Sequence, residues 1–224
     1  MSIRSPEQVA LLTDYDAGSA YSVAYHTLYA NICCNWNNEQ TQHTLLLTTP
    51  SSYAGQAMVA ANVAIAAAQS GTPTILIDAD LRSPGLAQRF GLNKSTGLSD
   101  LLLADTLNTQ EIKQHLSATF IPGLHLLSAG TATEGTFPTV ATKFQGILQT
   151  LCSFLQETAT PPSLIICHSP AVLAGPEASL ISAHVEQTML TIIKGRTTRK
   201  QAKQAQEQLE RTHAHLLGIV MLDV

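Results

Sequence analysis

The chain has 224 residues, a length that fits one domain. Hydrophobic residues make up 45% of it and charged residues only 12%, about half the usual share of roughly 25%, which predicts a large buried core. The net charge of −4 at pH 7 argues against a nucleic-acid partner and against direct binding to an anionic membrane, because both require a basic surface.

The cysteines and the N-terminal segment indicate the cellular compartment of the protein. The chain has four cysteines and no CxxC pair, which fits a reducing cytoplasmic setting better than a disulfide scaffold. Residues 1–16 lack the apolar core of a signal peptide, and no segment reaches the roughly 18 apolar residues that a membrane span needs. We therefore expect a soluble cytoplasmic protein that reaches the inner face of the membrane only through a partner.

The first elements are expected in the order helix, strand, helix. Residues 1–20 have no clear pattern and are interpreted as an irregular lead-in to a single domain over residues 21–224. Residues 19–36 place Val23, Leu28 and Ile32 at helical spacing. A short apolar strand is expected at residues 43–49. The Ala-rich helix that follows is apolar nearly all round, which predicts burial on both sides, and Gly71 marks its end.

The rest of the chain alternates short apolar runs with helical patterns. None of the apolar runs shows strict polar–apolar alternation, which is typical of a parallel sheet covered by helices on both faces. The expected fold is therefore a doubly wound, mainly parallel α/β domain. Strands are expected at residues 72–80, 123–130, 163–173, 187–195 and 216–224, and helices at residues 82–91, 97–105, 109–116, 142–159, 177–185 and 197–215.

Three strand ends carry small or polar residues: "LLLTTPSS", "ILIDADLR" and "LIICHSPA". In open α/β sheets, ligands bind beyond the carboxyl ends of the strands. These three segments are therefore the expected site.

Long stretches of the sequence resemble a known family. The stretches are "TLLLTT…AANVAIAAAQSGTPTILIDADLRSPGLAQRFGL…GLSDLLL", "LIICHSPAVL" and "IIKGRTTRKQAKQAQEQLERTHAHLLGIVM". From about Tyr21 onward, the chain resembles the cytoplasmic domain of the bacterial tyrosine kinases of capsule and exopolysaccharide assembly. That family lies in the deviant-Walker group of P-loop ATPases, with MinD and ParA. The resemblance implies a P-loop NTPase-like fold and a nucleotide site.

The segment at the family's phosphate loop departs from the family pattern. That loop ends in Gly-Lys-Ser/Thr, where the lysine reaches phosphate and the hydroxyl binds Mg²⁺. Gly55 remains here, with Gln56 in place of the lysine and Ala57 in place of the hydroxyl residue. Ser51 and Tyr53 stand where glycines are usual, so we expect a loop of another shape. We also hypothesise that Tyr53 lies in the phosphate space.

Of the other two motifs, the first is kept and the second is lost. Asp78 and Asp80 match the family's acidic positions, which help to place the metal and to activate the attacking hydroxyl. The alternative is structural: Asp78 accepts hydrogen bonds from loop backbone and Asp80 caps the next turn, with Arg82 paired to one of them. His168 replaces the family's metal-binding Asp. Because Cys167 and His168 are adjacent on a strand, they point to opposite faces and are not expected to share a metal.

The family's assembly features are also changed. A Glu and two Args on its first helix build a ring, and the resemblance places Val23, His26 and Tyr29 at those positions. With Tyr25, they form a candidate interaction surface. The family's C-terminal tyrosine cluster has no counterpart in the printed sequence.

Because the lysine, the hydroxyl residue, one metal-binding carboxylate, the ring contact and the tyrosine cluster of the family are all replaced, we expect a kinase-like protein without catalytic activity. It is expected to act as a scaffold or regulator in polysaccharide assembly or export. Its expected partner is a membrane co-polymerase-like adaptor or an active kinase-like relative. We expect no bound cofactor, with residual ATP, ADP or Mg²⁺ binding as the open alternative.

Three other functions stay open. The first is a remodelled ATPase that uses Asp78, Asp80 and His168. The second is a ParA/MinD-like positioning protein, and the third is a self-assembling structural protein. A homo-oligomer is compatible with each of them.

Overall fold

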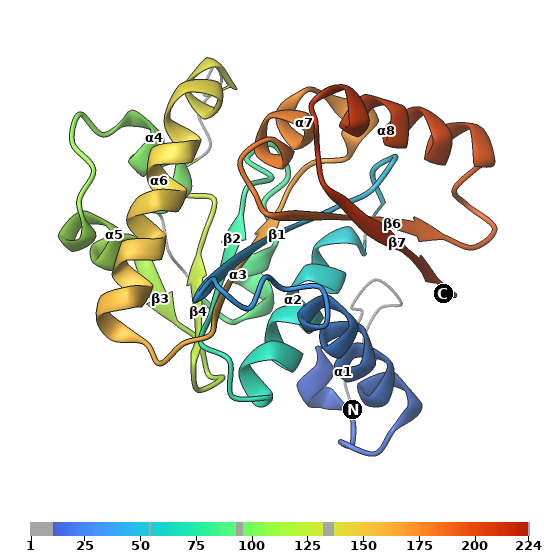
Figure 1. The fold of residues 1–224 in the computed structure, drawn as a ribbon, viewed down its shortest axis with the longest axis horizontal. Helices are drawn as coiled ribbons and strands as arrows, with labels where there is room; N and C mark the ends of the chain where they lie inside the picture. Colours follow the sequence, from blue (N-terminus) through green and yellow to red (C-terminus); the bar gives the residue numbers. More distant parts are fainter. Residues whose placement is uncertain (1–10, 54, 93–95, 132–136, 224) are drawn as a thin grey trace.

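The computed structural model describes residues 11–53, 55–92, 96–131 and 137–223, without the side chains of residues 137–139. Within these residues the chain forms one seven-stranded sheet in the order β3-β4-β2-β5-β1-β6-β7 (Figure 1). All neighbouring pairs are parallel except β3 with β4. The strands are β1 (Gln42–Thr48), β2 (Thr74–Asp78), β3 (Leu116–Ala118), β4 (Leu124–Leu127), β5 (Ser163–His168), β6 (Gln187–Ile193) and β7 (Leu216–Leu222).

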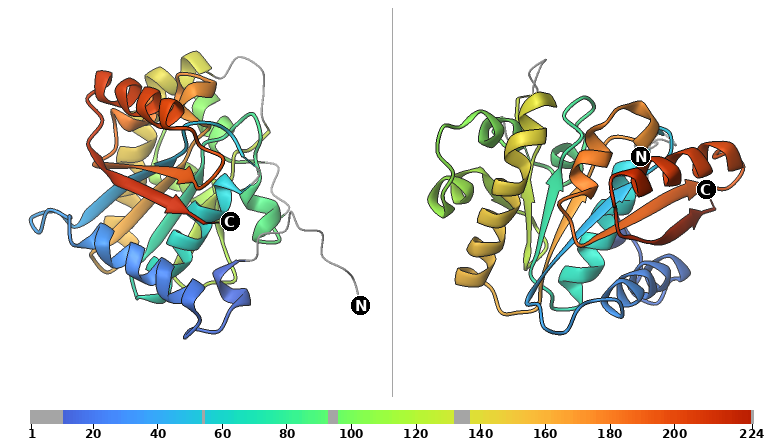
Figure 2. Two further views of the ribbon diagram at one scale, coloured as in Figure 1. Left: turned by 90° about the vertical axis from the view of Figure 1, so that its right-hand side faces the viewer. Right: turned by 45° about the horizontal axis from the view of Figure 1, so that its top comes forward.

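Helices cover both faces of the sheet (Figures 1 and 2). One face packs against α2 and α3, with α1 outside α2, and the other against α4 to α8. This confirms the predicted doubly wound α/β fold. The helices are α1 (Ala20–Cys33), α2 (Gln56–Gln69), α3 (Leu86–Arg89), α4 (Leu98–Leu103), α5 (Thr109–His115), α6 (Phe137–Thr158), α7 (Glu177–Ser182) and α8 (Arg199–Arg211), with short 3₁₀ turns η1 (Leu12–Asp14) and η2 (Val172–Ala174).

The Ala-rich helix α2 lies between the sheet and α1, as its all-round apolar pattern predicts. Every residue from Ala57 to Ala67 is buried. Small side chains let α1 and the sheet approach its backbone closely on opposite sides, and the contact area removed from water favours that arrangement. Asn62 is the polar exception within that span. Its side chain is fully buried, and it accepts from the Leu12 N–H at 2.9 Å and donates to the Tyr21 hydroxyl at 2.8 Å.

The structure differs from the sequence-based expectations in the N-terminal lead-in and at strand β3. The lead-in is not wholly irregular, because η1 forms and Leu11 and Leu12 are buried in the core beside α2. Residues 1–10 of that lead-in lie outside the described residues. The short strand β3 was not predicted, because three residues are too few to show a periodicity.

In the described part of the chain, no helix is both long and apolar enough to cross a membrane.

Candidate functional site

A pocket of about 410 Å³ lies beyond the carboxyl ends of β1, β2 and β5, where the sequence places the site. It brings together five of the predicted residues, namely Tyr53, Gln56, Ala57, Asp80 and His168. The full lining is Ser52, Tyr53, Gln56, Ala57, Asp80, Ser83, Gly85, Arg89 and His168. Ser51, Gly55, Asp78 and Arg82 lie outside this lining.

The loop between β1 and α2 is anchored to the loop after β5. The N–H of Val172 donates to the Thr49 carbonyl at 2.8 Å, and the N–H of Leu173 donates to the Pro50 carbonyl at 3.1 Å. Gly55 then caps α2. Among the described non-glycine residues, only His213 has a positive φ, so Ser51 and Tyr53 avoid the left-handed backbone that glycine favours. Neither residue therefore needs a glycine at its position in this loop.

The Gln56 side chain connects two walls of the pocket. Its Oε1 accepts a hydrogen bond from the Thr49 hydroxyl at 3.1 Å. Its Nε2 donates to Asp80 Oδ2, also at 3.1 Å. The Gln56 amide is thus held between the end of β1 and the residue two positions after β2.

Both acidic side chains receive backbone hydrogen bonds. Asp80 Oδ1 accepts from the Ser83 N–H at 3.0 Å. Asp78 Oδ2 accepts from the N–H groups of Gly85 and Leu86, both at 3.1 Å. This is the arrangement that the structural interpretation of the two carboxylates expects. Asp78 Oδ1 is buried and has no hydrogen-bond partner among the described residues.

Burial shifts the protonation of two neighbouring groups. It raises the pKa of Asp78 to about 6, against the lowering effect of the Leu86 and Gly85 N–H groups. It lowers the pKa of His168 to about 4, and the charge of Arg89 adds to this effect. His168 is therefore a neutral imidazole at pH 7 and does not replace a carboxylate in charge.

The Tyr53 side chain is half-buried, and its hydroxyl end lies inside the protein. Its hydroxyl is buried with no hydrogen-bond partner among the described residues, and its ring lines the pocket. Burial raises the pKa of this hydroxyl, with a smaller contribution from Tyr25. This is the orientation that the hypothesis of a tyrosine in the phosphate space requires.

The prediction that Arg82 pairs with Asp78 or Asp80 is wrong. The Arg82 Nη2 donates to Glu177 Oε1 on α7. The hydrogen bonds to Asp78 and Asp80 come from loop N–H groups and from Gln56. Arg82 therefore joins the β2–α3 loop to α7 and does not line the pocket.

The interaction surface expected on α1 also needs correction. Tyr25 and Tyr29 are only 8% and 7% exposed, because they face the core beside α2. The Tyr29 hydroxyl shares a hydrogen bond with the Thr72 hydroxyl. Of the four residues predicted there, only Val23, at 52% exposed, and the half-buried His26 remain accessible.

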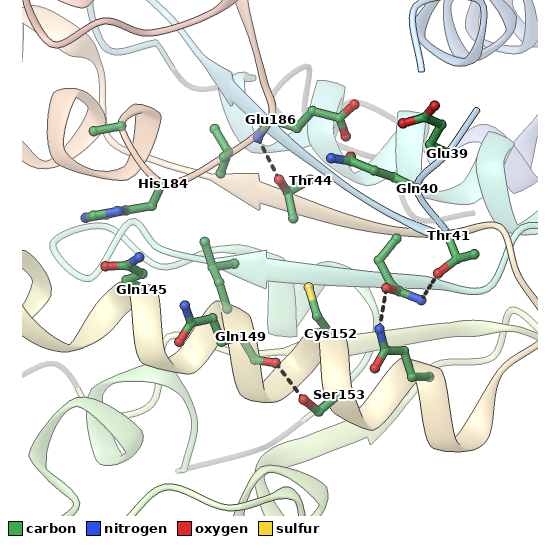
Figure 3. A pocket seen from close by; sticks show the side chains of 15 residues that line it. Glu39, Gln40, Thr41, Thr44, Gln145, Gln149, Cys152, Ser153, His184 and Glu186 are labelled. Atoms are coloured by element: carbon green, nitrogen blue, oxygen red, sulfur yellow. Dashed lines mark hydrogen bonds between the residues drawn. The ribbon is translucent and has the colours of Figure 1, made fainter. Parts of the chain in front are cut away.

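Sequence reasoning missed a second pocket of about 840 Å³ near the amino ends of β1 and β6 (Figure 3). Figure 3 shows Gln145 and Gln149 on α6 across from Thr44 and Glu186. The signal for it was the repeated glutamines on one side of α6. The Glu186 N–H donates to the Thr44 hydroxyl at 2.7 Å, which closes part of the pocket wall.

Across the described chain, no three His, Cys, Asp or Glu side chains gather as metal ligands.

Comparisons with known proteins place the chain among kinase-like relatives. No family model matches the chain. It is 28% identical over 203 residues to the tyrosine-protein kinase YwqD of Bacillus subtilis strain 168, covering 91% of this chain and 81% of that protein. The structure superposes on the crystal structure of the chimerical protein CapA2B2 with a TM-score of 0.80 at 25% identity, covering 94% and 88% of the two chains.

A more distant likeness concerns the fold alone. The septum site-determining protein MinD of Pyrococcus horikoshii, solved with Mg-ADP, has a TM-score of 0.65 at 16% identity, covering 80% of this chain and 70% of that one. The sheet and its helices thus follow the MinD/ParA-like pattern of P-loop NTPases.

Proposed function

This chain is a relative of the bacterial tyrosine-protein kinases within the MinD/ParA-like fold group, and from this premise we propose that it is a kinase-like regulator without phosphoryl-transfer activity. Its proposed role is to act as a scaffold in capsule or exopolysaccharide assembly. The observation that carries the proposal is the Gln56 amide held between Thr49 and Asp80.

The residues at the pocket do not fit a magnesium triphosphate. Phosphoryl transfer depends on positive charge and metal ions that neutralise the transferred group. Gln56 supplies no charge, and its amide already binds Asp80, a carboxylate at one of the family's acidic positions. Ala57 has no hydroxyl for a metal, and His168 is neutral and buried. These residues therefore offer a bound nucleotide neither the cationic side chain nor the metal ligands that phosphoryl transfer uses.

What these residues do instead is structural. The Gln56 bridge and the two backbone hydrogen bonds from Val172 and Leu173 join the loop to β2 and to the segment after β5. The ends of β1, β2 and β5 are thus tied together by the chain's own groups. A scaffold requires a fixed shape in the resting state, and these contacts support one.

The proposal is tested by calorimetry of the purified chain with Mg-ATP and by measurement of phosphate release. We expect no heat of binding at micromolar concentrations and no turnover above the buffer rate. Asp80→Ala serves as the matched control, because any residual hydrolysis at this pocket should disappear in it. Micromolar binding together with turnover that requires Asp80 would overturn the proposal.

The proposed partner is a membrane co-polymerase-like adaptor or an active kinase-like relative. The exposed part of α1 at Val23 and His26 lies at the family's assembly positions and supports a protein contact there. Val23→Glu should weaken adaptor binding, whereas Thr27→Glu, on the exposed side of the same helix, tests whether charge alone is responsible. Equal loss in both variants would assign the effect to charge.

A remodelled nucleotide site is the second candidate function. The observation that favours it is the unpartnered, buried Asp78 Oδ1 beside a pocket that contains Arg89 and Asp80. An unsatisfied buried carboxylate oxygen costs free energy, which a ligand or ion could recover. ADP binding that is lost in Asp78→Asn would favour this candidate over the scaffold.

A further inference from the structure

The second pocket, near the amino ends of β1 and β6, is a polar groove of about 840 Å³ along α6 (Figure 3). The α6 residues that line it run from Gln145 to Gln156, a length of about 16 Å along the helix axis. The first pocket lies beyond the carboxyl ends of the strands, so the two are at opposite ends of the sheet. The groove therefore has room for an elongated ligand and is separate from the first pocket.

The charges of the groove argue against an anionic ligand. Its described lining contains two carboxylates, Glu39 and Glu186, and neither lysine nor arginine. A phosphate, a nucleotide or an acidic headgroup is usually held by cationic side chains. Most of the other lining side chains are uncharged hydrogen-bonding groups, and they include five glutamines. The lining is therefore suited to an uncharged ligand that both donates and accepts hydrogen bonds.

Two of these glutamines have unused amides. Gln145 and Gln149 are exposed, and among the described residues their side chains have no hydrogen-bond partner. Figure 3 shows both side chains rising from α6 toward the opposite wall. They are one helical turn apart, with about 6 Å between their Cβ atoms. An amide donates and accepts, as a hydroxyl does, so the pair can bind hydroxyls at opposite edges of one sugar ring.

The opposite wall presents groups whose positions are fixed. Glu186 Oε2 shares a hydrogen bond with His43 Nδ1 at 2.9 Å, and the buried His43 ring stacks on Trp36 with 4.2 Å between ring centroids. The Thr44 hydroxyl accepts from the Glu186 N–H, so its own proton can be donated to a ligand. An acceptor and a donor are thus held in place before a ligand binds, which lowers the entropy cost of binding.

One end of the groove is closed by its own side chains. Gln156 Nε2 donates to Gln42 Oε1 at 2.8 Å, and Gln42 Nε2 donates to the Thr41 hydroxyl at 2.7 Å. These amides are already paired with each other and with the wall. The groups that remain for a ligand are therefore those around Gln145 and Gln149.

A peptide ligand would need features that this groove lacks. β1 pairs with β5 on one side and with β6 on the other, so it offers no open edge to a peptide strand. A helical peptide needs an apolar groove, and a proline-rich peptide needs aromatic walls. The described lining contains no Phe, Tyr or Trp and only four apolar side chains. The same lack of aromatic rings and cations disfavours single-stranded nucleic acid.

We propose that this groove binds an uncharged, hydroxyl-rich ligand, namely a short segment of a neutral glycan. The amides of Gln145 and Gln149 bind its hydroxyls from one wall, and Thr44 and Glu186 bind them from the other. The dissociation constant is on the order of 1 mM, because each hydroxyl exchanges water for a protein partner and no ring in the described lining stacks on the sugar. The inference goes beyond the proposed regulator role, because it rests on the lining of the groove alone.

Titration of the full chain with uncharged trisaccharides of glucose, galactose and N-acetylglucosamine, followed by NMR of the backbone amides, tests the site. At least one of them should shift the signals of residues 39–44 and 145–153. Gln145→Ala combined with Gln149→Ala should raise the dissociation constant about tenfold or more. Gln204→Ala, at an exposed glutamine on α8, is the matched control and should leave it unchanged.

The same spectra show whether the double variant keeps its fold outside the groove. The proposal is wrong if none of the trisaccharides binds at about 20 mM, or if binding persists in a folded double variant. Failure here is distinguishable from failure of the proposed function, because Mg-ATP binding and phosphate release are measured separately and concern the other end of the sheet.

Two further probes test the class of ligand. A trisaccharide with one glucuronate should bind about three- to fivefold more weakly than its neutral counterpart, because Glu39 and Glu186 repel it. Glu39→Gln should reduce this difference. Equal affinity of wild type for both sugars would contradict an uncharged ligand. Pentalysine tests the peptide alternative: if it shifts the signals of the groove and the trisaccharides do not, the groove is a site for basic peptides and the proposal is wrong.

Discussion

Asp78 and His168 are partners in register at the ends of the neighbouring parallel strands β2 and β5. The N–H of Ala79 donates to the His168 carbonyl at 2.7 Å, which fixes the two strand ends together. Burial shifts both side chains toward their neutral forms, raising the pKa of Asp78 and lowering that of His168. Their contributions to stability therefore have opposite dependences on pH.

Asp78→Asn should change the pH dependence of stability. With its pKa raised to about 6, folded Asp78 holds a proton that the unfolded chain has released, so its contribution to stability falls as pH rises from about 4 to 6. Relative to wild type, the variant should gain at most about 2–3 kcal/mol of unfolding free energy across this window. Urea denaturation at pH 4, 5 and 7.5 measures the difference. A difference that is independent of pH would contradict the assigned pKa.

His168→Gln should have the opposite effect. With its pKa lowered to about 4, folded His168 stays neutral where the unfolded imidazole binds a proton, so wild type loses stability as pH falls from about 6.5 to 4. The variant should lack this loss, worth about 3 kcal/mol at most. The same denaturation series measures it, with the exposed His213→Asn as control. An unchanged slope in His168→Gln would show that burial does not suppress protonation there.

Gly97→Ala should destabilise the fold because of a close backbone approach. A Cβ at Gly97 would lie 2.0 Å from the Ser128 carbonyl oxygen and 2.7 Å from the Gly130 nitrogen. Backbone cannot move aside cheaply, so we expect a loss of about 2–4 kcal/mol. Gly18→Ala is the matched control, because a Cβ there meets nothing within 4 Å. Thermal or urea unfolding compares the two, and equal stability would contradict the clash.

Asn62→Leu should release the segment before α1. The substitution removes the acceptor for the buried Leu12 N–H and the donor to the Tyr21 hydroxyl. An orphaned buried group costs about 1–3 kcal/mol. Hydrogen exchange should accelerate in residues 11–21 more than in β1. Gln69→Leu, exposed on the same helix, should change neither. Uniform acceleration would instead indicate global destabilisation.

Gln56→Lys combined with Ala57→Ser should restore little ATP binding. The new ammonium group remains beside Asp80, and His168 still provides no third carboxylate. We expect less than a tenfold change in ATP affinity by calorimetry. Adding His168→Asp supplies the missing charge and is the informative comparison. A large gain from the double variant alone would assign the defect to the loop.

Much of the fold could be predicted because its signals are local. The apolar runs, the helical spacing and terminators such as Gly71 specify the elements and their parallel order. The short β3 carries too little pattern, and the burial of Leu12 depends on Asn62, which lies 50 positions away along the chain. Such pairings are set by tertiary contacts and leave no trace in local spacing.

The sequence predicts where this pocket lies, but only part of the contacts around it. Tyr53, Gln56 and Asp80 meet in one pocket because three strand ends meet there. Arg82 was assigned to the nearest carboxylates in sequence, whereas its partner Glu177 comes from α7. The sequence of α1 does not show which of its faces α2 covers, so the burial of its tyrosines could not be predicted.

The place of β1 in the sheet has a consequence for biosynthesis. Its two neighbours are β5 and β6, so Leu45 pairs with Ile166 and Gln187, more than a hundred residues later in the chain. Contacts of such sequence separation form late and slow folding. On the ribosome, β1 must wait without a strand partner until β5 and β6, in the last third of the chain, have emerged. A nascent chain arrested before residue 163 should therefore remain sensitive to protease along β1.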